Sequence, residues 1–354
     1  MTANASPSPQ PRRSRSVSLG QVDSLVIASP VLSEGESRAA AEILGAAAVE
    51  DGRQAVSEQG RLRLKAPLPR AGVVHLLQSV VTPAGGGHED VGYAQLEVPA
   101  AGRAGTAELA VAPGHRGAGF GRLLVHAVLA EASAAKQGND SNDSNDADDL
   151  DFAVEFWAHG GHPAARHLAD AYGAELVREL RQMRRTVGAA DTTEQPVLPE
   201  GVTVRTFRPG RDGAEWLRLN ALAFAHHPEQ GAWTEQDLAD RLAEPWFDPA
   251  GFFLAIRDER IVGFHWTKVH PEGLGEVYVV GVDPAEQGNG LGRALTAIGL
   301  RHLAEERKLE TVLLYVDADN SAAVRVYERL GFTIHEVDLM YRVSGHRTAE
   351  QTAE

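Results

Sequence analysis

An internal repeat constrains this 354-residue chain more than any other feature. Residues 116–122 (RGAGFGR) are similar to residues 287–293 (QGNGLGR), 171 positions later, and each run follows a Val-x-Pro sequence. Residues 164–174 are similar to residues 322–332, but only 158 positions later. The difference of 13 positions equals the length of the Asn- and Asp-rich segment 138–150, which lies between the matched segments of the first copy. One insertion therefore explains both offsets, and the sequence predicts a duplicated domain.

Changes in composition mark where the two copies begin and end. Segments rich in Ser, Pro, Asn and Asp without an apolar period cannot bury a core, so we assign them to tails, loops and linkers. The length also fits two domains of roughly 100–200 residues each. The predicted organisation is a disordered leader at 1–20, an N-terminal domain at 21–187 with an acidic insertion at 137–151, a linker at 188–200, a C-terminal domain at 201–345 and a tail at 346–354.

Apolar periodicity predicts an α+β unit in each copy. Asn320 is a favourable N-cap for the last helix, and Gly331 suits the position just after that helix ends. The fold class that follows is two tandem domains, each a mixed, mostly antiparallel sheet flanked by helices. In the second copy the predicted elements are, in order, a hairpin of 252–256 and 261–266 around Asp258-Glu259, a strand at 275–282, a helix at 292–308, a strand at 311–316, a helix at 321–330 and a closing strand at 333–343.

Composition excludes several classes of protein. The absence of cysteine excludes a disulfide framework, a thiolate zinc site and a cysteine nucleophile. The formal net charge of −15 argues against a nucleic-acid-binding protein. Apolar runs such as residues 279–282 are too short to cross a membrane, and no secretory signal follows the N-terminal arginines. We therefore expect a cytoplasmic protein. His226 and His227 lack a further ligand at metal-binding spacing, so we expect no bound metal.

The glycine-rich turn is the predicted ligand site in each copy. A strand that ends in such a turn and opens a helix directs backbone N–H groups, and the positive end of the helix dipole, at an anion. Glycines at 288, 290 and 292 let the backbone approach the ligand closely. Neither copy has the Gly-Lys-Ser/Thr ending of a P-loop, and the spacing differs from the G-x-G-x-x-G dinucleotide fingerprint.

The pattern Gln/Arg-x-x-Gly-x-Gly after Val-x-Pro resembles the pyrophosphate-binding turn of the GNAT acetyltransferase superfamily. The later run with Asn320, Ala323, Tyr327, Gly331 and Phe332 adds to the resemblance, which covers about residues 22–343 in two copies. It implies the acyl-CoA N-acyltransferase fold with acetyl-CoA as the acetyl donor. The acetyl-CoA contacts that it implies are Val280, Gly281, Val282, Gln287, Gly288, Asn289, Gly290, Leu291, Gly292, Arg293, Asn320, Ser321, Ala322, Ala323, Val324 and Arg325 in the second copy, and Leu109, Ala110, Val111, Gly117, Ala118, Gly119, Phe120, Gly121 and Arg122 in the first.

The resemblance also implies two catalytic groups in the second copy. Attack of an amine on a thioester needs a base for the ammonium proton and an acid for the leaving thiolate. Glu276 is the implied base and Tyr327 the implied acid. At the two offsets, Glu276 aligns with Gly105 and Tyr327 with Ala169, so the first copy lacks both groups. We therefore expect a degenerate first copy that can hold acetyl-CoA, and chemistry in the second copy only.

Longer runs resemble one family within this superfamily. Residues 224–231, 263–271 and 274–284 are similar to mycothiol synthases, which are also tandem proteins. That resemblance implies acetylation of the cysteinyl amine of cysteinyl-glucosaminyl-inositol, the last step of mycothiol biosynthesis in actinobacteria. The acceptor contacts that it implies are Glu58, Glu229, Lys268, Glu276 and Tyr315.

Two other functions fit the same motifs. A tandem GNAT enzyme could acetylate a different small amine, such as an aminoglycoside. A binding module could sense acetyl-CoA without turnover, and the first copy, which lacks both catalytic groups, suits that function best. In every case the expected partner is a small molecule, without nucleic acid or membrane, and the expected state is a monomer.

Overall fold

The computed structural model describes residues 11–345 apart from 20–21, 82–86, 100–103, 140–151, 189–190, 192–195 and 228. By contacts between residues, the chain divides into two units. The first unit combines the residues up to Glu179 with those from Val337 onward, and the second unit is Leu180–Glu336. Two domains were predicted as the contiguous segments 21–187 and 201–345. The residues of the two units differ from these segments, because the end of the chain belongs to the first unit and residues 180–187 belong to the second.

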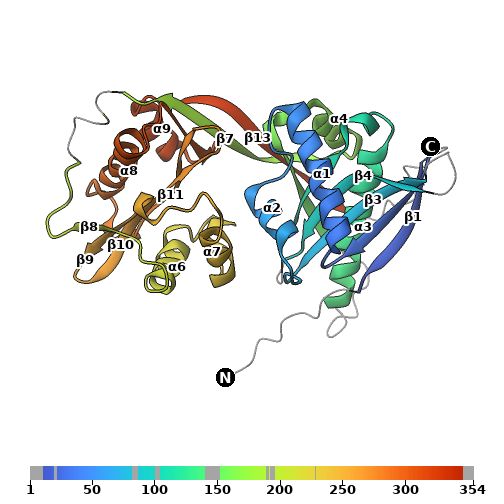
Figure 1. The fold of residues 1–354 in the computed structure, drawn as a ribbon, viewed down its shortest axis with the longest axis horizontal. Coiled ribbons are helices and arrows are strands. Elements are labelled where there is room, and N and C mark those ends of the chain that lie inside the picture. Colours follow the sequence, from blue (N-terminus) through green and yellow to red (C-terminus); the bar gives the residue numbers. More distant parts are fainter. Residues whose placement is uncertain are drawn as a thin grey trace, which may run out of the picture. The chain divides into compact units, whose positions relative to one another are not determined.

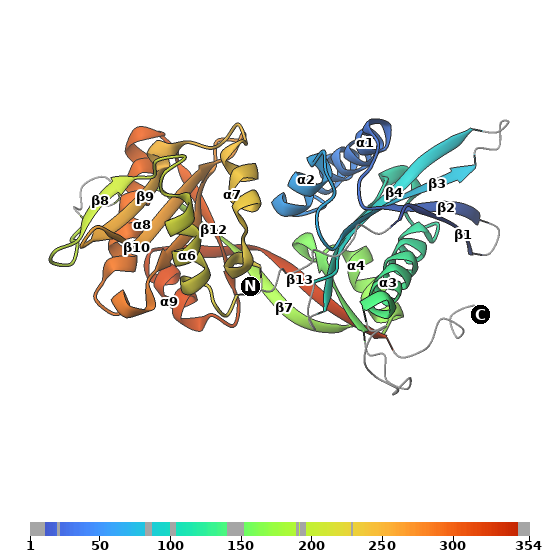
Figure 2. The ribbon, with the colours of Figure 1, turned by 90° about the horizontal axis from the view of Figure 1, so that it is seen from below.

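The first unit is a sheet covered by helices on both faces (Figure 1). The strand order is β1-β2-β3-β4-β5-β6-β13, antiparallel at each of these pairs except the parallel pair β5–β6. Helices α1 and α2 lie on one face and α3 on the other (Figure 2). The elements are β1 (Arg13–Leu19), β2 (Val22–Ser29), α1 (Glu34–Asp51), α2 (Glu58–Lys65), β3 (Val73–Val81), β4 (His88–Glu97), β5 (Gly105–Val111), α3 (Phe120–Asn139), β6 (Phe152–Ala158), α4 (Pro163–Ala171) and β13 (Thr333–Gly345).

Alternating side chains of the strands supply both layers of this core. Leu76 and Ala94 pack with Leu124 and Val128 of α3. The neighbouring strand residues, among them Leu77, point to the opposite face and pack on α1. Ser33 caps α1 with a capping box, in which the Glu36 side chain accepts a hydrogen bond from the Ser33 backbone N–H.

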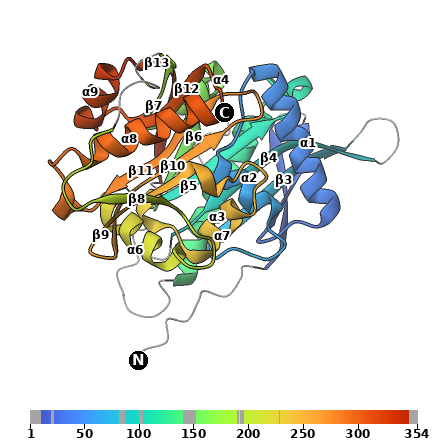
Figure 3. The same ribbon diagram turned by 60° about the vertical axis from the view of Figure 1, so that its left-hand side comes forward.

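The second unit has the strand order β7-β12-β11-β10-β9-β8, antiparallel at β12–β7, β10–β11, β9–β10 and β8–β9 and parallel at β11–β12. Helix α8 lies over β10 and β11 (Figure 3), while α6 packs on the opposite face through Trp216. The elements are β7 (Glu175–Thr186), β8 (Thr203–Thr206), α6 (Gly213–Ala223), α7 (Glu235–Leu242), β9 (Phe252–Arg257), β10 (Arg260–Val269), β11 (Gly275–Val282), α8 (Leu291–Arg301), a π-helical turn η6 (His302–Glu306), β12 (Thr311–Asp317) and α9 (Ser321–Arg329).

The predicted elements of the second copy are confirmed with small shifts at their ends. The hairpin turns at Asp258 and Glu259, both with positive φ, and Asn320 caps α9 by accepting a hydrogen bond from Ala323 N–H. Gly331 follows α9 with φ of 84°. The predicted helix 292–308 is shorter, because the α-helix changes to the π-helical turn at His302.

The predicted disordered leader is wrong for part of its length. Arg13–Leu19 form β1, which pairs with β2 along the whole strand. The Ser- and Arg-rich composition suggests a tail, whereas the backbone ladder with β2 does not depend on apolar side chains. Residues 1–10 and 346–354 lie outside the described residues, as does most of the predicted insertion, of which residues 137–139 continue α3.

The closing strands of the two copies are exchanged between the units. Strand β13 comes last in the chain, yet Leu339–Gly345 pair with β6 of the first unit. Strand β7 ends the first copy, yet Leu180–Thr186 pair with β12 of the second unit. The sequence predicted a closing strand at 333–343 but not its partner, because the alternation of apolar residues shows that a strand exists without specifying its neighbour.

Candidate active site

Each unit contains a pair of parallel strands that separate after three paired residues. In the second unit, Gly275–Val277 of β11 pair with Val312–Leu314 of β12, and β11 then continues to Val282 without pairing to β12. In the first unit, β5 pairs with β6 only through Gly105, Thr106 and Ala107. The later residues of β11 and β5 therefore present backbone N–H and C=O groups that an extended ligand can use.

A β-bulge distinguishes the two copies at this strand. In the second unit Trp266 pairs with Val279 and Thr267 with Val277, so Tyr278 is the extra residue. The corresponding pairing of β4 with β5 has no such shift between Gly92–Val111 and Glu97–Thr106. By register Glu276 therefore corresponds to Thr106. The alignment of Glu276 with Gly105 was wrong by one residue, because a fixed offset cannot register a bulge.

The glycine-rich turns have the same backbone in both copies. Gly117 and Gly119 have φ of 77° and 89°, and Gly288 and Gly290 have φ of 82° and 89°. A side chain at these positions would adopt a left-handed conformation that only glycine takes readily. Space is open around Gly117, Gly288 and Gly290, and the turns lead directly into α3 and α8. The exposed turns and the helix N-termini suit the pyrophosphate of acetyl-CoA.

The turn of the second unit presents its predicted ligand residues to solvent. Asn289 accepts a hydrogen bond from Leu291 N–H at 3.1 Å, which satisfies one free donor at the start of α8. Leu291 itself is buried and packs in the core. Gly281 is required for another reason, since a Cβ there would lie 2.7 Å from the ring of Phe264. The predicted residues with exposed side chains or backbone are Gln287, Gly288, Asn289, Gly290, Arg293, Asn320, Ser321, Ala322 and Arg325.

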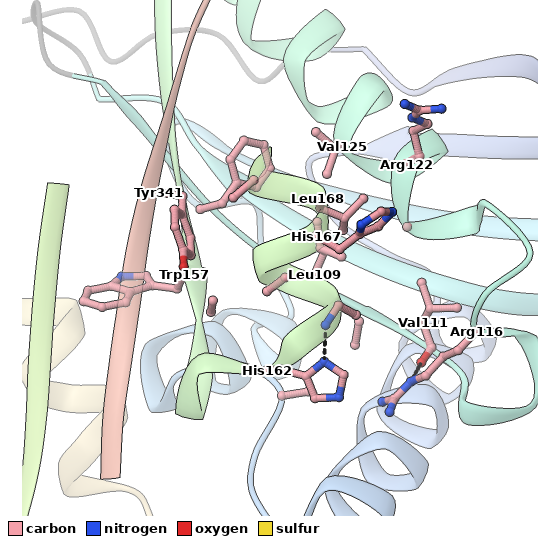
Figure 4. Close-up of a pocket in the computed structure, with 18 of the residues that line it drawn as sticks. Leu109, Val111, Arg116, Arg122, Val125, Trp157, His162, His167, Leu168 and Tyr341 are labelled. Atoms are coloured by element: carbon pink, nitrogen blue, oxygen red, sulfur yellow. Dashed lines mark hydrogen bonds between the residues drawn. The ribbon is translucent and has the colours of Figure 1, made fainter. Parts of the chain in front are cut away.

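The first unit holds a cavity of about 490 Å³ at its glycine-rich turn (Figure 4). The walls come from β5, from the start of α3, from α4 and from Tyr341 of β13. Ala118 and Phe120 do not line it, and the Phe120 side chain is buried beneath the turn. The predicted acetyl-CoA residues that line the cavity are Leu109, Ala110, Val111, Gly117, Gly119, Gly121 and Arg122.

Acidic and basic side chains meet at the cavity of the first unit. Asp51, at the end of α1, accepts two hydrogen bonds from the Arg116 guanidinium at 2.7 and 2.8 Å. This pairing lowers the pKa of Asp51 and raises that of Arg116. His162 is the N-cap of α4, and its Nε2 lies 3.6 Å from the same carboxylate. Arg116 replaces Gln287 of the other copy, so the two turns differ in charge.

The candidate base lies on the bulged strand of the second unit. Glu276 is 5% exposed and lies opposite Lys268 in the β10–β11 register. Its carboxylate is 2.7 Å from Nε2 of His270. The Lys268 ammonium lies over the rings of Trp246 and Tyr278, at 4.4 and 5.1 Å from their centroids. A carboxylate and an ammonium thus share one face of the sheet, which suits an acceptor that carries an amine and hydroxyl groups.

Tyr315 extends the same face on β12. Its side chain is 42% exposed, and its hydroxyl accepts a hydrogen bond from Gln182 Nε2 at 2.7 Å. Gln182 in turn accepts one from Arg184 Nε, also at 2.7 Å. The register places Tyr315 opposite Gln182, and Leu313 opposite both Glu276 and Arg184. Side chains two residues apart share a face, so this polar row lies on the same face as Glu276.

The candidate acid lies on α9. The Tyr327 ring packs edge-on against Phe332, with centroids 5.9 Å apart. Burial raises the pKa of the Tyr327 hydroxyl, which keeps its proton at neutral pH. Within the described part of the chain this hydroxyl makes no hydrogen bond. In the first unit the corresponding Ala169 has no such group.

The other two predicted acceptor residues, Glu229 and Glu58, belong to different elements. Glu229 is exposed and begins the 3-10 turn after α6, where its N–H lies 3.3 Å from His227 Nδ1. Glu58 is the first residue of α2 in the first unit, and its contact with the acceptor stays a prediction. The sequence did not indicate that His270, Trp246 and Gln182 are neighbours of the predicted residues. His270 flanks a Pro-Glu-Gly turn six residues before Glu276, and that spacing could have indicated a hairpin contact.

Neither a membrane-spanning helix nor a cluster of metal ligands is present in the described ranges. No helix there is long and apolar enough to cross a membrane. Within the same ranges, no group of three or more His, Cys, Asp or Glu side chains could hold a metal ion.

The duplicated sheets with their glycine-rich turns define a tandem GNAT fold. Residues 216–332 match the model of the Acetyltransferase (GNAT) family. A tandem GNAT protein from the clavulanic acid biosynthesis pathway is similar in structure, with a TM-score of 0.64 and 16% identity over 89% of this chain and 96% of that one. A GCN5-related N-acetyltransferase from Sphaerobacter thermophilus has a TM-score of 0.61 and 24% identity over 90% and 95% of the two chains.

Sequence comparison specifies the family within this fold. The chain is 58% identical over 314 residues to the mycothiol acetyltransferase of Streptomyces scabiei, covering 88% of this chain and 93% of that protein. It is 48% identical over 297 residues to the mycothiol acetyltransferase of Thermomonospora curvata, covering 84% and 90%. The chain therefore belongs to the mycothiol acetyltransferase family of actinobacteria, as the resemblance predicted.

Proposed function

We propose that this protein transfers the acetyl group of acetyl-CoA to the cysteinyl amine of cysteinyl-glucosaminyl-inositol and so forms mycothiol. The observation that carries the proposal is the buried Glu276 opposite Lys268, next to the strand bulge of the second unit. Membership in the mycothiol acetyltransferase family supports the choice of acceptor. We further propose that the enzyme is a cytoplasmic monomer.

The proposed mechanism assigns one proton transfer to each catalytic group. Glu276 removes a proton from the acceptor ammonium, directly or through water, and the free amine attacks the thioester carbonyl. Backbone N–H groups of β11 beyond Val277, where the strand no longer pairs with β12, would polarise that carbonyl. The C–S bond breaks, Tyr327 gives its proton to the leaving thiolate, and the second proton of the attacking nitrogen passes to the tyrosinate and restores the hydroxyl. A high pKa suits Tyr327 to this role, because the hydroxyl remains protonated until the thiolate forms.

Acetyl-CoA is a substrate in this scheme, and its binding residues are those of the turn and the adjacent elements. The predicted strand residues Val280–Val282 would line the pantetheine, residues 287–293 would hold the pyrophosphate and residues 320–325 would flank it. The exposed left-handed glycines and the start of α8 support this assignment. Lys268, Glu229 and Tyr315 would hold the hydroxyl-rich acceptor.

The first unit is proposed to bind acetyl-CoA without turnover. Its cavity of about 490 Å³ lies beside seven of the predicted contacts. Thr106 and Ala169 occupy the positions of Glu276 and Tyr327, so neither proton transfer has its group there.

The acceptor assay tests the proposed function. The full chain is incubated with acetyl-CoA and, separately, with cysteinyl-glucosaminyl-inositol and a panel of aminoglycosides, and thiol release and product mass are measured. Acetylation of the cysteinyl amine is expected. Acetylation of aminoglycosides alone would show that the acceptor is an aminoglycoside and not cysteinyl-glucosaminyl-inositol. Acetyl-CoA binding without transfer to any amine would indicate a sensor.

A further inference from the structure

The proposed reaction releases one proton in each cycle. An ammonium loses two protons when it becomes an amide, and the leaving thiolate takes up one. The remaining proton must reach solvent before the next turnover. Glu276 is the proposed acceptor of the ammonium proton, but its side chain is only 7% exposed. A buried base of this kind needs a route by which it returns to its charged form.

His270 connects this carboxylate to solvent. Its Nε2 lies 2.7 Å from Oε2 of Glu276, and its side chain is 25% exposed. Within the described residues His270 is the hydrogen-bond partner that the structure gives the Glu276 carboxylate. One ring nitrogen therefore faces the base, while a quarter of the side chain remains exposed to solvent.

The backbone holds His270 and Glu276 in this arrangement. Both residues belong to one hairpin, in which β10 ends at Val269 and β11 begins at Gly275. The His270 N–H donates to the Leu274 carbonyl at 2.8 Å, and the Gly273 N–H donates to the His270 carbonyl at 2.9 Å. Gly273 has φ of 78°, which glycine adopts without strain. The two side chains thus meet through a short, hydrogen-bonded turn.

The charged groups near this pair come from several elements. Lys268 of β10 lies opposite Glu276, and Arg184 of β7 shares the same face by register. Arg241 of α7 donates to the Tyr278 hydroxyl at 2.7 Å, and Glu272 lies exposed in the turn itself. Among these neighbours, His270 alone carries an imidazole ring, whose two nitrogens can take up a proton on one side and release one on the other.

We propose that His270 positions Glu276 and carries its proton to solvent. In this step the O–H bond of protonated Glu276 breaks and an N–H bond forms at His270 Nε2. The imidazolium then loses its Nδ1 proton to water, which leaves an Nε2–H that donates to the Glu276 carboxylate. Exchange with solvent returns the ring hydrogen to Nδ1 before Glu276 releases its next proton. No electron is transferred, and Glu276 returns as a carboxylate. This inference rests on the proposed function and adds a residue that acts through the base.

The test compares His270→Gln and His270→Asn with the full unaltered chain under saturating acetyl-CoA. Glutamine and asparagine can hydrogen bond but cannot carry the proton. Loss of a proton-transfer group is expected to lower kcat about tenfold or more, while the KM of the acceptor changes less than about twofold. Added imidazole should restore kcat in His270→Asn, and kcat should rise with buffer concentration in both variants. The matched control is His335→Gln, an exposed histidine of the same unit, with unchanged kinetics expected.

Two results would overturn the inference. Unchanged kcat and an unchanged pH profile in both variants would show that the proton leaves by another route. A loss of kcat that neither imidazole nor buffer restores, with an unchanged melting temperature, would show a structural role only. These results leave the proposed function intact as long as the unaltered chain acetylates the acceptor. Failure of the unaltered chain to acetylate any amine would instead overturn the proposed function.

Discussion

Lys268 and Glu276 lie opposite each other on β10 and β11, and both side chains are buried. The Lys268 ammonium is held over two aromatic rings, 4.4 Å from the centroid of Trp246. Cation–π contacts of a desolvated ammonium contribute on the order of 2 kcal/mol. The opposite charges on one face suggest distinct tasks, with Glu276 acting on the acceptor amine and Lys268 on its hydroxyl oxygens.

Replacing Lys268 with Met tests its task. Methionine keeps most of the apolar stem over Trp246 but removes the charge. We expect the KM of the acceptor to rise about tenfold or more, because a charged hydrogen bond contributes about 1.5–3 kcal/mol. The KM of acetyl-CoA should stay unchanged. Steady-state kinetics with each substrate varied in turn measures both values.

The matched control is Lys308→Met, an exposed lysine after the π-helical turn of the same unit. Its kinetics should equal those of the unaltered chain. An equal rise of both KM values in Lys268→Met would place Lys268 outside the acceptor site.

A bulky residue in the cavity of the first unit should remove acetyl-CoA binding there without affecting turnover. Ala165 of α4 lines that cavity, so Ala165→Trp would fill part of it. Isothermal titration is expected to give two acetyl-CoA per chain before the change and one afterwards, with kcat unchanged. The control Arg166→Trp alters the exposed neighbour on the same helix, which is not among the lining residues, and should keep two.

The turnover of Ala165→Trp also decides where the chemistry occurs. Loss of kcat with the second unit still loaded with acetyl-CoA would contradict a non-catalytic first unit.

His265 should make the second unit sensitive to acid. Burial lowers the pKa of His265 to about 4, although a hydrogen bond between Nδ1 and the Leu295 carbonyl opposes the shift. Its folded pKa lies below the ordinary value of 6.5, so its contribution to stability is complete above pH 6.5 and is lost as pH falls toward 4. The loss between pH 7 and pH 5 should be about 2 kcal/mol.

Urea titrations at pH 7 and pH 5 measure this loss. His265→Asn is expected to lower stability at pH 7 and to show a smaller change between the two pH values. The exposed His226→Gln is the control and should keep the original pH dependence. An unchanged dependence in His265→Asn would assign the acid sensitivity to other groups.

His159 should stabilise the first unit as an ion between two carboxylates. Its ring nitrogens lie 2.8 Å from Glu108 and 3.1 Å from Asp338. Burial alone would lower the pKa of His159, but these hydrogen bonds raise it to about 10. The folded pKa lies above the ordinary 6.5, so the contribution is complete below pH 6.5 and is lost as pH rises through about 10.

Substituting His159→Gln should therefore cost about 3–5 kcal/mol at neutral pH, because it leaves a buried carboxylate without its cation. The double variant with Glu108→Gln should lose less than the sum of the two single losses. Thermal unfolding of these variants and of the exposed control His88→Gln measures the differences. Additive losses would contradict the ion pair.

Local sequence patterns predicted much of this fold. The glycines at 288 and 290 adopt the left-handed conformation that the turn requires, and Asn320 caps α9 as its side chain allows. These features depend only on a few residues that are neighbours in the sequence, so they can be predicted from it. The repeat shows the glycine-rich turn twice.

Features that depend on distant partners could not be predicted. The exchange of β7 and β13 depends on which strand each one pairs with, and both strands carry the same Met-x-Arg pattern. The bulge at Tyr278 appears only in the register with β10. The contact of His270 with Glu276 follows from the hairpin geometry between them.

The most direct test of the account is acetyl transfer to cysteinyl-glucosaminyl-inositol by Glu276→Gln, an isosteric change that removes the base. We expect kcat/KM to fall about 10²–10⁴-fold while acetyl-CoA binding is retained. Glu259→Gln, an exposed residue in the turn before β10, should retain full activity as the control. Unchanged turnover and an unchanged pH profile in Glu276→Gln would contradict the assignment of the chemistry to this carboxylate.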